Sequence, residues 1–403
     1  MTTDLARTRP SELSLTALFL KFLRFGFLAF GGPVAQIAMI RQALVEEERW
    51  IDPARFNRLL AVLQVLPGPE AHELCVHLGM VARGRIGGLL AGLGFMLPGL
   101  ALMLVAGWLY VGWIAGKAGL AGVLLGVQVV VLAIILRAVV RIGEHVVEDR
   151  LLALIAVASL LATLAGMPFW IPLVAGGLVY AVSHRPVATA LIAVAAIGVA
   201  VAIHPATGPA AGVPATTAAP VTLAALFVAG LKGGLLTFGG AYTAIPYVRA
   251  DTVGRGWIAD GTFLDGIALA GVLPAPLVIF ATFVGYVAGG PGGALAITAG
   301  MFLPAFAFSL VLFERLEAIV ENPALHRLLA GVAAAVVGII AATFVQLGQA
   351  TGARVADPLF ALLLFAAALA VVWRVKGAWV TPAVVAGGAI AGWVGMSVQG
   401  LGG

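Results

Sequence analysis

Charged side chains are scarce in this sequence. Lys, Arg, Asp and Glu make up 10% of its 403 residues, whereas an ordinary soluble domain carries about 25%. A soluble protein with a large apolar core needs a polar exterior that so few charges cannot supply, so that class is excluded. The sequence is 62% hydrophobic, with a mean hydropathy of +1.10. It predicts an all-α, polytopic helical membrane protein embedded in the lipid bilayer.

Cysteine and the usual enzyme motifs are also scarce or missing. Cys75 is the only cysteine, so an internal disulfide is excluded and a thiolate metal site is not indicated. The sequence has no GxxxxGK[ST] phosphate loop and no HExxH motif, which argues against an ATP-driven pump or an intramembrane protease. The net charge of +5 reflects basic cytoplasmic loops more than nucleic-acid binding. We expect no enzymatic activity, cofactor, metal or nucleic-acid partner.

The two halves of the sequence resemble each other. Residues 25–33 read FGFLAFGGP and residues 233–241 read GGLLTFGGA, which places the two FGG motifs 208 positions apart. At a spacing of 207, the LPGP of residues 66–69 falls on the LPAP of residues 273–276. Five such matches occur in the same order, which indicates a duplication. The expected parts are a first transmembrane repeat at 14–183, a connecting span and linker at 184–219, and a second repeat at 220–396.

Apolar runs of roughly the length that crosses a bilayer recur in both repeats. The expected spans are 14–31, 56–80, 86–112, 118–140, 150–166, 168–183, 186–204, 220–238, 263–288, 292–313, 326–349, 357–373 and 378–396. An odd number of crossings before the second repeat inverts it relative to the first, a recurrent plan in secondary transporters. The distribution of loop arginines favours a cytoplasmic N-terminus. The segment 56–80 is expected to cross the membrane, with a re-entrant hairpin as the alternative.

Proline motifs interrupt two apolar spans at equivalent positions. The motifs are Pro67-Gly68-Pro69 and Pro274-Ala275-Pro276. Because proline removes a backbone donor and clashes with the preceding turn, each motif is expected to break its span into two half-helices. The half-helix that starts after Pro69 points the free N–H groups of Glu70, Ala71 and His72 at the break, which forms an anion site. A packing kink without a ligand is the alternative.

Two basic residues are expected at membrane depth. Arg24 and Lys232 are equivalent, each six residues before an FGG motif. Intramembrane cations are costly and usually face a transport pathway or a partner, although snorkelling towards the interface is the alternative. The glycines after each phenylalanine let the chain turn beside an anion; they are Gly31, Gly32, Gly239 and Gly240. Together these groups predict a binding site for a small, preferably divalent anion.

The first proline motif is followed by groups that can carry a proton. Glu70, His72 and Glu73 lie there, whereas the second repeat has the apolar run 277–279. Histidine and buried carboxylic acids exchange protons near neutral pH, so we expect proton coupling in the first repeat. Pairing with Arg83 and Arg85 is the alternative role. Asp265 is a further proton-coupling candidate, or a helix cap.

These motifs resemble those of the chromate ion transporter family. FGGPVAQI, LPGPEAHEL and GFMLPG are similar to its first-half signature, and TFGGAYTAIPYVRAD, FLDGIAL and ATFVGY to its second-half signature. The resemblance extends from about residue 14 to 350, as in the long, two-domain members. It implies an inner-membrane carrier that exports chromate by using the proton motive force, with sulfate as a related tetrahedral dianion.

The resemblance also implies which residues function. It covers Arg24, Lys232, Gln64, Pro67-Gly68-Pro69 and Asp265. Two departures leave the substrate open: Ala275 replaces the usual glycine, and Arg58 stands where an acidic residue is expected.

Two other functions remain open. Sulfate or other anion uptake or exchange is possible on the same fold, and an anion or proton channel is a remoter alternative, because no ring of polar lining residues is evident. The expected partners are a small inorganic oxyanion, protons and lipid. Glycine-rich faces can pack within one subunit or against a second copy, so a homodimer is a further candidate.

Overall fold

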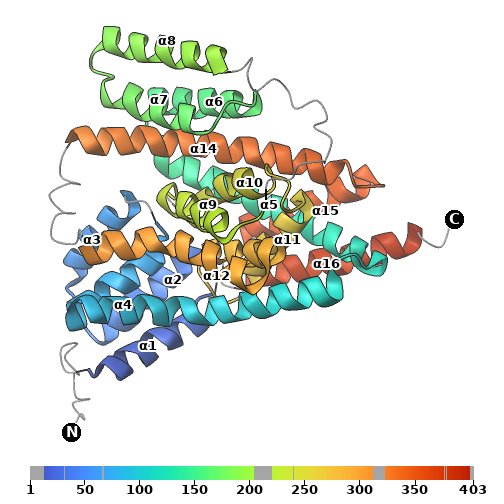
Figure 1. Ribbon diagram of the computed structural model, residues 1–403, viewed down its shortest axis with the longest axis horizontal. Coiled ribbons are helices and arrows are strands. Elements are labelled where there is room, and N and C mark those ends of the chain that lie inside the picture. Colours follow the sequence, from blue (N-terminus) through green and yellow to red (C-terminus); the bar gives the residue numbers. More distant parts are fainter. Residues whose placement is uncertain are drawn as a thin grey trace.

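A computed structural model describes residues 13–30, 32–65, 68–203, 220–238, 240–311, 323–375, 377 and 379–399. Within these ranges the regular secondary structure is entirely helical, as the sequence predicts. Gly31, Pro67 and Gly239 lie outside the described residues, as does the side chain of Gln64. The helices form stacked, nearly parallel rows (Figure 1).

The first half runs from α1 to α8. Its elements are α1 (Leu15–Phe27), α2 (Gly32–Arg41), the π-helix η2 (Gln42–Glu47), α3 (Pro53–Val65), α4 (Glu70–Leu109), the π-helix η3 (Tyr110–Ile114), η4 (Ala118–Leu120), α5 (Ala121–Val146), α6 (Arg150–Leu164), α7 (Trp170–Ala181) and α8 (Pro186–Ile203). The second half runs from α9 to α16. Its elements are α9 (Leu223–Leu235), η6 (Ala241–Ala244), α10 (Ile245–Thr252), α11 (Asp260–Val272), η7 (Leu277–Ile279), α12 (Phe280–Val311), α14 (Pro323–Gly352), α15 (Pro358–Arg374) and α16 (Val380–Gln399).

Helix length separates two kinds of element. Four described helices are long and apolar enough to cross a membrane: Glu70–Ile114, Ala121–Val146, Leu277–Val311 and Leu325–Gly352. Others are shorter, such as α1 and α9 with 13 residues each, which cover about 20 Å of the roughly 30 Å hydrocarbon layer. The spans expected at 14–31 and 220–238 are therefore helices of about two thirds of the full crossing length, because each helix ends before its FGG motif.

A sharp turn divides α4 into two antiparallel segments. Arg83 has φ −142° and ψ 32°, and Gly84 has φ 63° and ψ −158°, a conformation that glycine adopts without strain. Gly79 before the turn packs against the backbone of Gly87 after it. The turn lies next to the start of α1, because Arg83 Nη1 donates to the carbonyl of Leu13 at 2.7 Å.

The same turn recurs in α12, 206 positions later in the sequence. Gly289 has φ −142° and ψ 22°, and Gly290 has φ 66° and ψ −162°. The segments on either side again fold together, since the hydroxyls of Thr282 and Thr298 share a hydrogen bond of 2.6 Å. Two equivalent turns of almost identical backbone geometry agree with the duplication seen in the sequence.

The segments that contain the proline motifs are also hairpins. In the second half, Phe263 of α11 and Phe280 of α12 contact edge to face, with ring centroids 5.6 Å apart. A straight helix would hold residues 17 positions apart at about 25 Å. In the first half Arg55 of α3 acts electrostatically on His77 of α4, which likewise requires the two helices to lie side by side. The chain therefore reverses its direction within each of these two segments.

The two halves interlock through exchanged contacts. α6 and α7 of the first half lie along α14 of the second (Figure 1), and Gly331 of α14 packs against the backbone of Gly176 in α7. Conversely, α15 and α16 pack on α5, where Gly126 lies against the backbone of Gly388. Glycine at these points lets the helix backbones approach closely.

Candidate functional site

The non-helical segments of the two halves meet. The described part of the first FGG turn (residues 28–30 and 32) follows α1, and that of the second FGG turn (residues 236–238 and 240) follows α9. The described part of the first proline break is residues 68–69, and the second proline break is residues 273–276. In the first turn Gly32 has φ 79°, and in the second Gly240 has φ 129°. Both described glycines therefore have the positive φ that a chain turn uses.

Each proline break binds the FGG turn of the opposite half. The N–H of Gly68 donates to the carbonyl of Thr237 at 2.8 Å. Gln36 of α2 donates through Nε2 to the carbonyls of Ala29 and Ala275, each at 2.9 Å. Thr237 is the equivalent of Ala29, and Ala275 is the equivalent of Gly68. The two equivalent pairs of positions are therefore both joined, Gly68 to Thr237 directly and Ala275 to Ala29 through the side chain of Gln36.

Helix α4 begins at the first proline break. Pro69 is its extended N-cap, with φ −74° and ψ 99°. The N–H groups of His72 and Glu73 both donate to the carbonyl of Pro69, at 2.9 and 3.0 Å. The sequence predicted a free backbone N–H at His72. The structure differs, because this N–H is bound to the carbonyl of Pro69 in the first turn of the helix. The N–H groups of Glu70 and Ala71 remain at the positive end of the helix dipole.

Glu73 turns back over the break. Its side chain is fully buried, and neither carboxylate oxygen has a hydrogen-bond partner among the described residues. Gly68 has φ 150°, and a Cβ built there would overlap Glu73 Oε1. The negative charge of Glu70, which is 9% exposed, acts on Glu73. Two carboxyl groups therefore share one buried helix start, an arrangement that is costly when both are ionised.

His72 lies in an aromatic enclosure built by both halves. Its ring centroid is 4.7 Å from that of Phe306 and 4.9 Å from that of Phe302, both on α12, and 6.5 Å from that of Phe95 on α4. Neither ring nitrogen completes a hydrogen bond within the described part, although the backbone of Gly92 lies nearby. The ring is fully buried, so this interface between the halves holds a titratable group in largely aromatic surroundings.

The two expected cations have different surroundings. Arg24 is exposed, and its guanidinium makes no hydrogen bond or ion pair with any residue that the structure describes. Lys232 Nζ lies 3.0 Å from Asp251 Oδ2, and Asp251 also binds Arg255 at 2.8 Å. Arg24 therefore keeps its donors available, whereas those of Lys232 are partly used.

Asp265 belongs to a buried network that joins the halves. Its carboxylate accepts from Tyr110 Oη and from Gln128 Nε2, each at 2.8 Å. Arg354 Nη2 donates to Gln128 Oε1 at 2.8 Å. Sequence reasoning missed these three partners and Gln36; a glutamine inside an apolar run was the available signal for Gln36 and Gln128.

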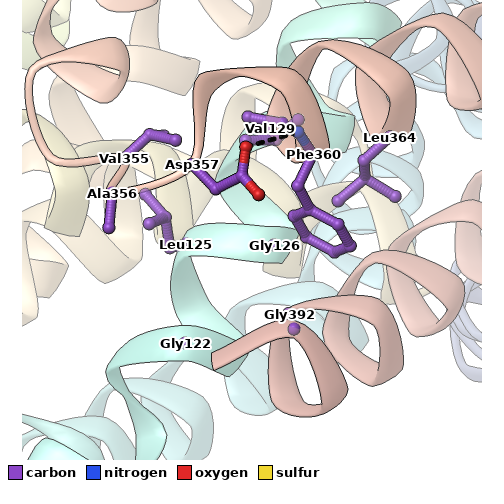
Figure 2. A pocket seen from close by; sticks show the side chains of 12 residues that line it. Gly122, Leu125, Gly126, Val129, Val355, Ala356, Asp357, Phe360, Leu364 and Gly392 are labelled. Atoms are coloured by element: carbon purple, nitrogen blue, oxygen red, sulfur yellow. Dashed lines mark hydrogen bonds between the residues drawn. The ribbon is translucent and has the colours of Figure 1, made fainter. Parts of the chain in front are cut away.

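A small cavity is lined by other residues. Figure 2 shows it between α5, α15 and α16, lined mostly by glycine and apolar side chains. Its one carboxylate, Asp357, accepts from the N–H groups of Leu359 and Phe360 at 3.0 Å each, so it caps α15. None of the expected site residues lines this cavity.

Comparison with known proteins identifies the family. The family model described as chromate transporter matches residues 16–182 and 224–393. The chain belongs to the chromate transporter family. It is therefore a membrane-embedded transporter and not an enzyme, and the family resemblance inferred from its motifs is confirmed.

Individual relatives cover most of the chain. The chromate transport protein of Pseudomonas aeruginosa is 55% identical over 395 residues, which is 97% of this chain and 95% of that protein. The chromate transport protein of Cupriavidus metallidurans is 31% identical over 369 residues, 88% of this chain and 87% of that protein. The probable chromate transport protein of Synechococcus elongatus is 29% identical over 347 residues, 83% and 85% of the two chains. No solved structure matches.

Proposed function

We propose that this protein is a secondary active transporter that exports chromate across the inner (plasma) membrane, driven by the proton motive force. The observation that carries the proposal is the reciprocal contact between each proline break and the opposite FGG turn. Unwound backbone at the junction of two repeats is where secondary transporters bind their substrates. The P. aeruginosa relative, named a chromate transport protein, supports chromate as the cargo.

The two halves act as inverted repeats. The halves match over the two regions of the family model, and their equivalent helices α4 and α12 run antiparallel: Gly88 packs against Leu310, and Gly92 against Phe306. Equivalent helices that oppose each other let one repeat rock against the other and expose the site alternately on either side. The N-terminus is on the cytoplasmic side in this proposal.

The anion binds at the first proline break. The N–H groups of Glu70 and Ala71 provide donors at the positive end of α4, and Arg24 supplies a guanidinium that can hold an oxyanion through two parallel N–H bonds. Lys232 joins when its ion pair with Asp251 opens. The remaining residues that we assign to the site are Gln64, Pro67, Gly68, Pro69, Gly31, Gly32, Gly239, Gly240, Pro274, Ala275 and Pro276.

Protons enter through the buried acids and the enclosed histidine. Glu70, His72, Glu73 and Asp265 are buried, and we assign proton coupling to them. The membrane potential adds to the driving force, because moving one charge through 100 mV changes the free energy by about 2.3 kcal/mol. An inside-negative potential therefore favours the exit of a dianion.

Everted membrane vesicles test this function directly. Radiolabelled chromate should accumulate in vesicles with an imposed pH gradient and potential, and ionophores that collapse both should abolish the accumulation. Labelled sulfate in the same assay tests the rival substrate. Accumulation that follows the potential alone and does not respond to the pH gradient would contradict a proton-driven carrier and indicate a channel. Accumulation of sulfate without chromate would assign the protein to sulfate transport.

A further inference from the structure

We propose that Asp265 carries the proton that is coupled to transport. Three positioning residues hold its carboxylate for this role: Tyr110, Gln128 and Arg354. The inference rests on the proposed function, because it assumes that protons drive the transport. It narrows the four groups assigned to proton coupling to one, and it gives a role to three residues outside the paired sequence motifs.

The structure supplies a donor for each oxygen of the ionised Asp265 carboxylate. Oδ2 accepts from Tyr110 Oη and Oδ1 accepts from Gln128 Nε2, each at 2.8 Å. All three side chains are buried. A buried charge is tolerated only when hydrogen bonds replace the water that it has lost, and here both oxygens have such a bond.

Arg354 fixes the direction of the Gln128 amide. Its Nη2 donates to Gln128 Oε1 at 2.8 Å, and a guanidinium has no acceptor. The amide therefore turns Nε2 towards Asp265, where this nitrogen also donates to the carbonyl of Gly261 at 3.2 Å. Arg354 is exposed, and its positive charge acts on Asp265. An exposed cation thus favours the charged form of a buried acid through one intervening amide.

The protonated form of Asp265 is accommodated as well, because a tyrosine hydroxyl can both donate and accept. Tyr110 Oη lies 3.5 Å from Thr262 Oγ1. When Oδ2 of Asp265 takes up a proton from solution, the new O–H donates to Tyr110 Oη. Tyr110 then turns its own O–H to Thr262, while Gln128 continues to donate to Oδ1. One O–H bond forms and none breaks, so the site gains one positive charge.

The groups after the first proline break lack this property. Neither carboxyl oxygen of Glu73 has a hydrogen-bond partner among the described residues, and Glu70 is a second acid beside it. Glu73 therefore stays uncharged, because ionisation in a buried place without donors is too costly. The ring nitrogens of His72 likewise complete no hydrogen bond in the described part of the chain. Asp265 is the candidate for which the described residues supply partners in both charge states.

The elements packed around α11 add no competing charge within the described residues. Tyr110 of η3 and Arg354, which follows α14, are the titratable groups that act on Asp265. The side chains that α12 and α16 place against glycines of α11 are uncharged, namely Phe283 and Thr381. A pH dependence of this network therefore belongs to Asp265.

The network links the proton to the movement of the halves. Tyr110 and Gln128 belong to the first half, whereas Asp265 and Arg354 belong to the second. Hydrogen bonds to an ionised carboxylate are roughly twice as strong as those between neutral groups. The ionised acid thus holds the halves in this arrangement, and proton uptake loosens them. Rocking of one repeat against the other becomes a proton-dependent step.

The first test separates proton-driven accumulation from exchange. Everted vesicles receive an imposed pH gradient, acid inside, while equal potassium concentrations and valinomycin hold the membrane potential at zero. The unmodified protein should accumulate labelled chromate. Asp265→Asn should show no accumulation, because the amide imitates the protonated acid and has no proton to release. The same variant should still exchange labelled chromate outside for unlabelled chromate inside.

Asp260→Asn is the matched control. Asp260 lies five residues earlier on α11 and pairs with Arg249 at 2.7 Å, and it is not among the residues assigned to transport. This variant should respond to the pH gradient as the unmodified protein does. Accumulation by Asp265→Asn equal to that of the control would overturn the inference and leave the proposed function intact. If the unmodified protein ignores the pH gradient, proton-driven transport itself fails.

The second test concerns the positioning residues. Gln128→Leu and Arg354→Gln each remove a group that favours the ionised acid, so the pH profile of chromate accumulation should move upward by about one unit. All variants are compared at the same pH, so the protonation of chromate itself cancels. A merely structural role would lower accumulation at every pH without moving the profile. Because Arg354 is exposed, its variant decides the question if the buried ones do not fold: an unmoved profile would overturn the inference.

Discussion

Replacing Gln36 with leucine tests the contact between the halves. The side chain of Gln36 is 1% exposed and donates to Ala29 and Ala275, which belong to different repeats. Leucine has a similar size and is as apolar as the surrounding helices, so the substitution removes the two hydrogen bonds without leaving a large cavity.

The expected magnitude follows from counting polar atoms. Gln36→Leu leaves the carbonyls of Ala29 and Ala275 without this donor, and each unsatisfied buried acceptor costs about 1–3 kcal/mol. Gln36 Oε1 is itself buried without a partner in the described part of the chain, so its removal recovers about as much as one of these losses. The net loss of stability is therefore about 1–3 kcal/mol.

The assay is thermal unfolding in detergent, followed by size-exclusion chromatography with fluorescence detection. Gln42→Leu is the control, because Gln42 lies six residues later and is exposed; an exposed substitution should change stability by less than about 0.5 kcal/mol. We expect Gln36→Leu to unfold at a clearly lower temperature than the control and to lower chromate export. Equal melting temperatures and equal export would show that this bridge does not hold the halves together.

Three further predictions concern single residues. Arg24→Gln should weaken oxyanion binding about 10- to 100-fold, as for the loss of one charge-assisted contact. Lys232→Gln should weaken binding less, because Asp251 already holds that lysine. Unchanged affinity in both variants would show that the anion site lies elsewhere. Gly68→Ala should cost at least about 1–3 kcal/mol through its strained backbone and the collision of the new Cβ with Glu73, whereas wild-type stability would contradict the tight fit at the break. Hydrogen bonds from Leu152 and Tyr180 hold the pKa of Asp149 below its usual value of 3.8. The stabilisation of α6 by this carboxylate is therefore present at neutral pH and is lost as the pH falls through the lowered pKa. Asp149→Ala should melt at a lower temperature than wild type at pH 7 and at the same temperature in strong acid.

Local properties of the sequence predicted much of this protein. The scarcity of charge predicts a helical membrane protein, because apolar side chains and internally satisfied backbone are what the bilayer accepts. Paired motifs predict a duplication, because both copies retain the same residues at turns. The glycines of the FGG motifs predict chain reversal, since a positive φ is an intrinsic preference of glycine, and Gly32 and Gly240 have it.

Helix direction and partnership could not be predicted in the same way. The turns at Gly84 and Gly290 fall between expected spans, after residues 80 and 288. The chain reversals at the two proline motifs were concealed inside the expected spans 56–80 and 263–288, because hydropathy responds to a run of apolar residues in the same manner whether the chain crosses the membrane or doubles back. The bridges from Gly68 to Thr237 and from Gln36 to Ala275 join positions far apart in the chain. Such pairs depend on how whole helices pack, and no local period encodes that packing.

The titratable residues after the first proline motif show most clearly which features the sequence predicts and which depend on packing. Their position after a proline in an apolar run was enough to predict that Glu70, His72 and Glu73 are buried, because no water reaches that depth without a cavity. Folding then gave them different surroundings: His72 lies among the phenylalanines of the other half, and Glu73 turns back over Gly68. Side-chain direction depends on which neighbours fill the remaining volume, and those neighbours come from both repeats.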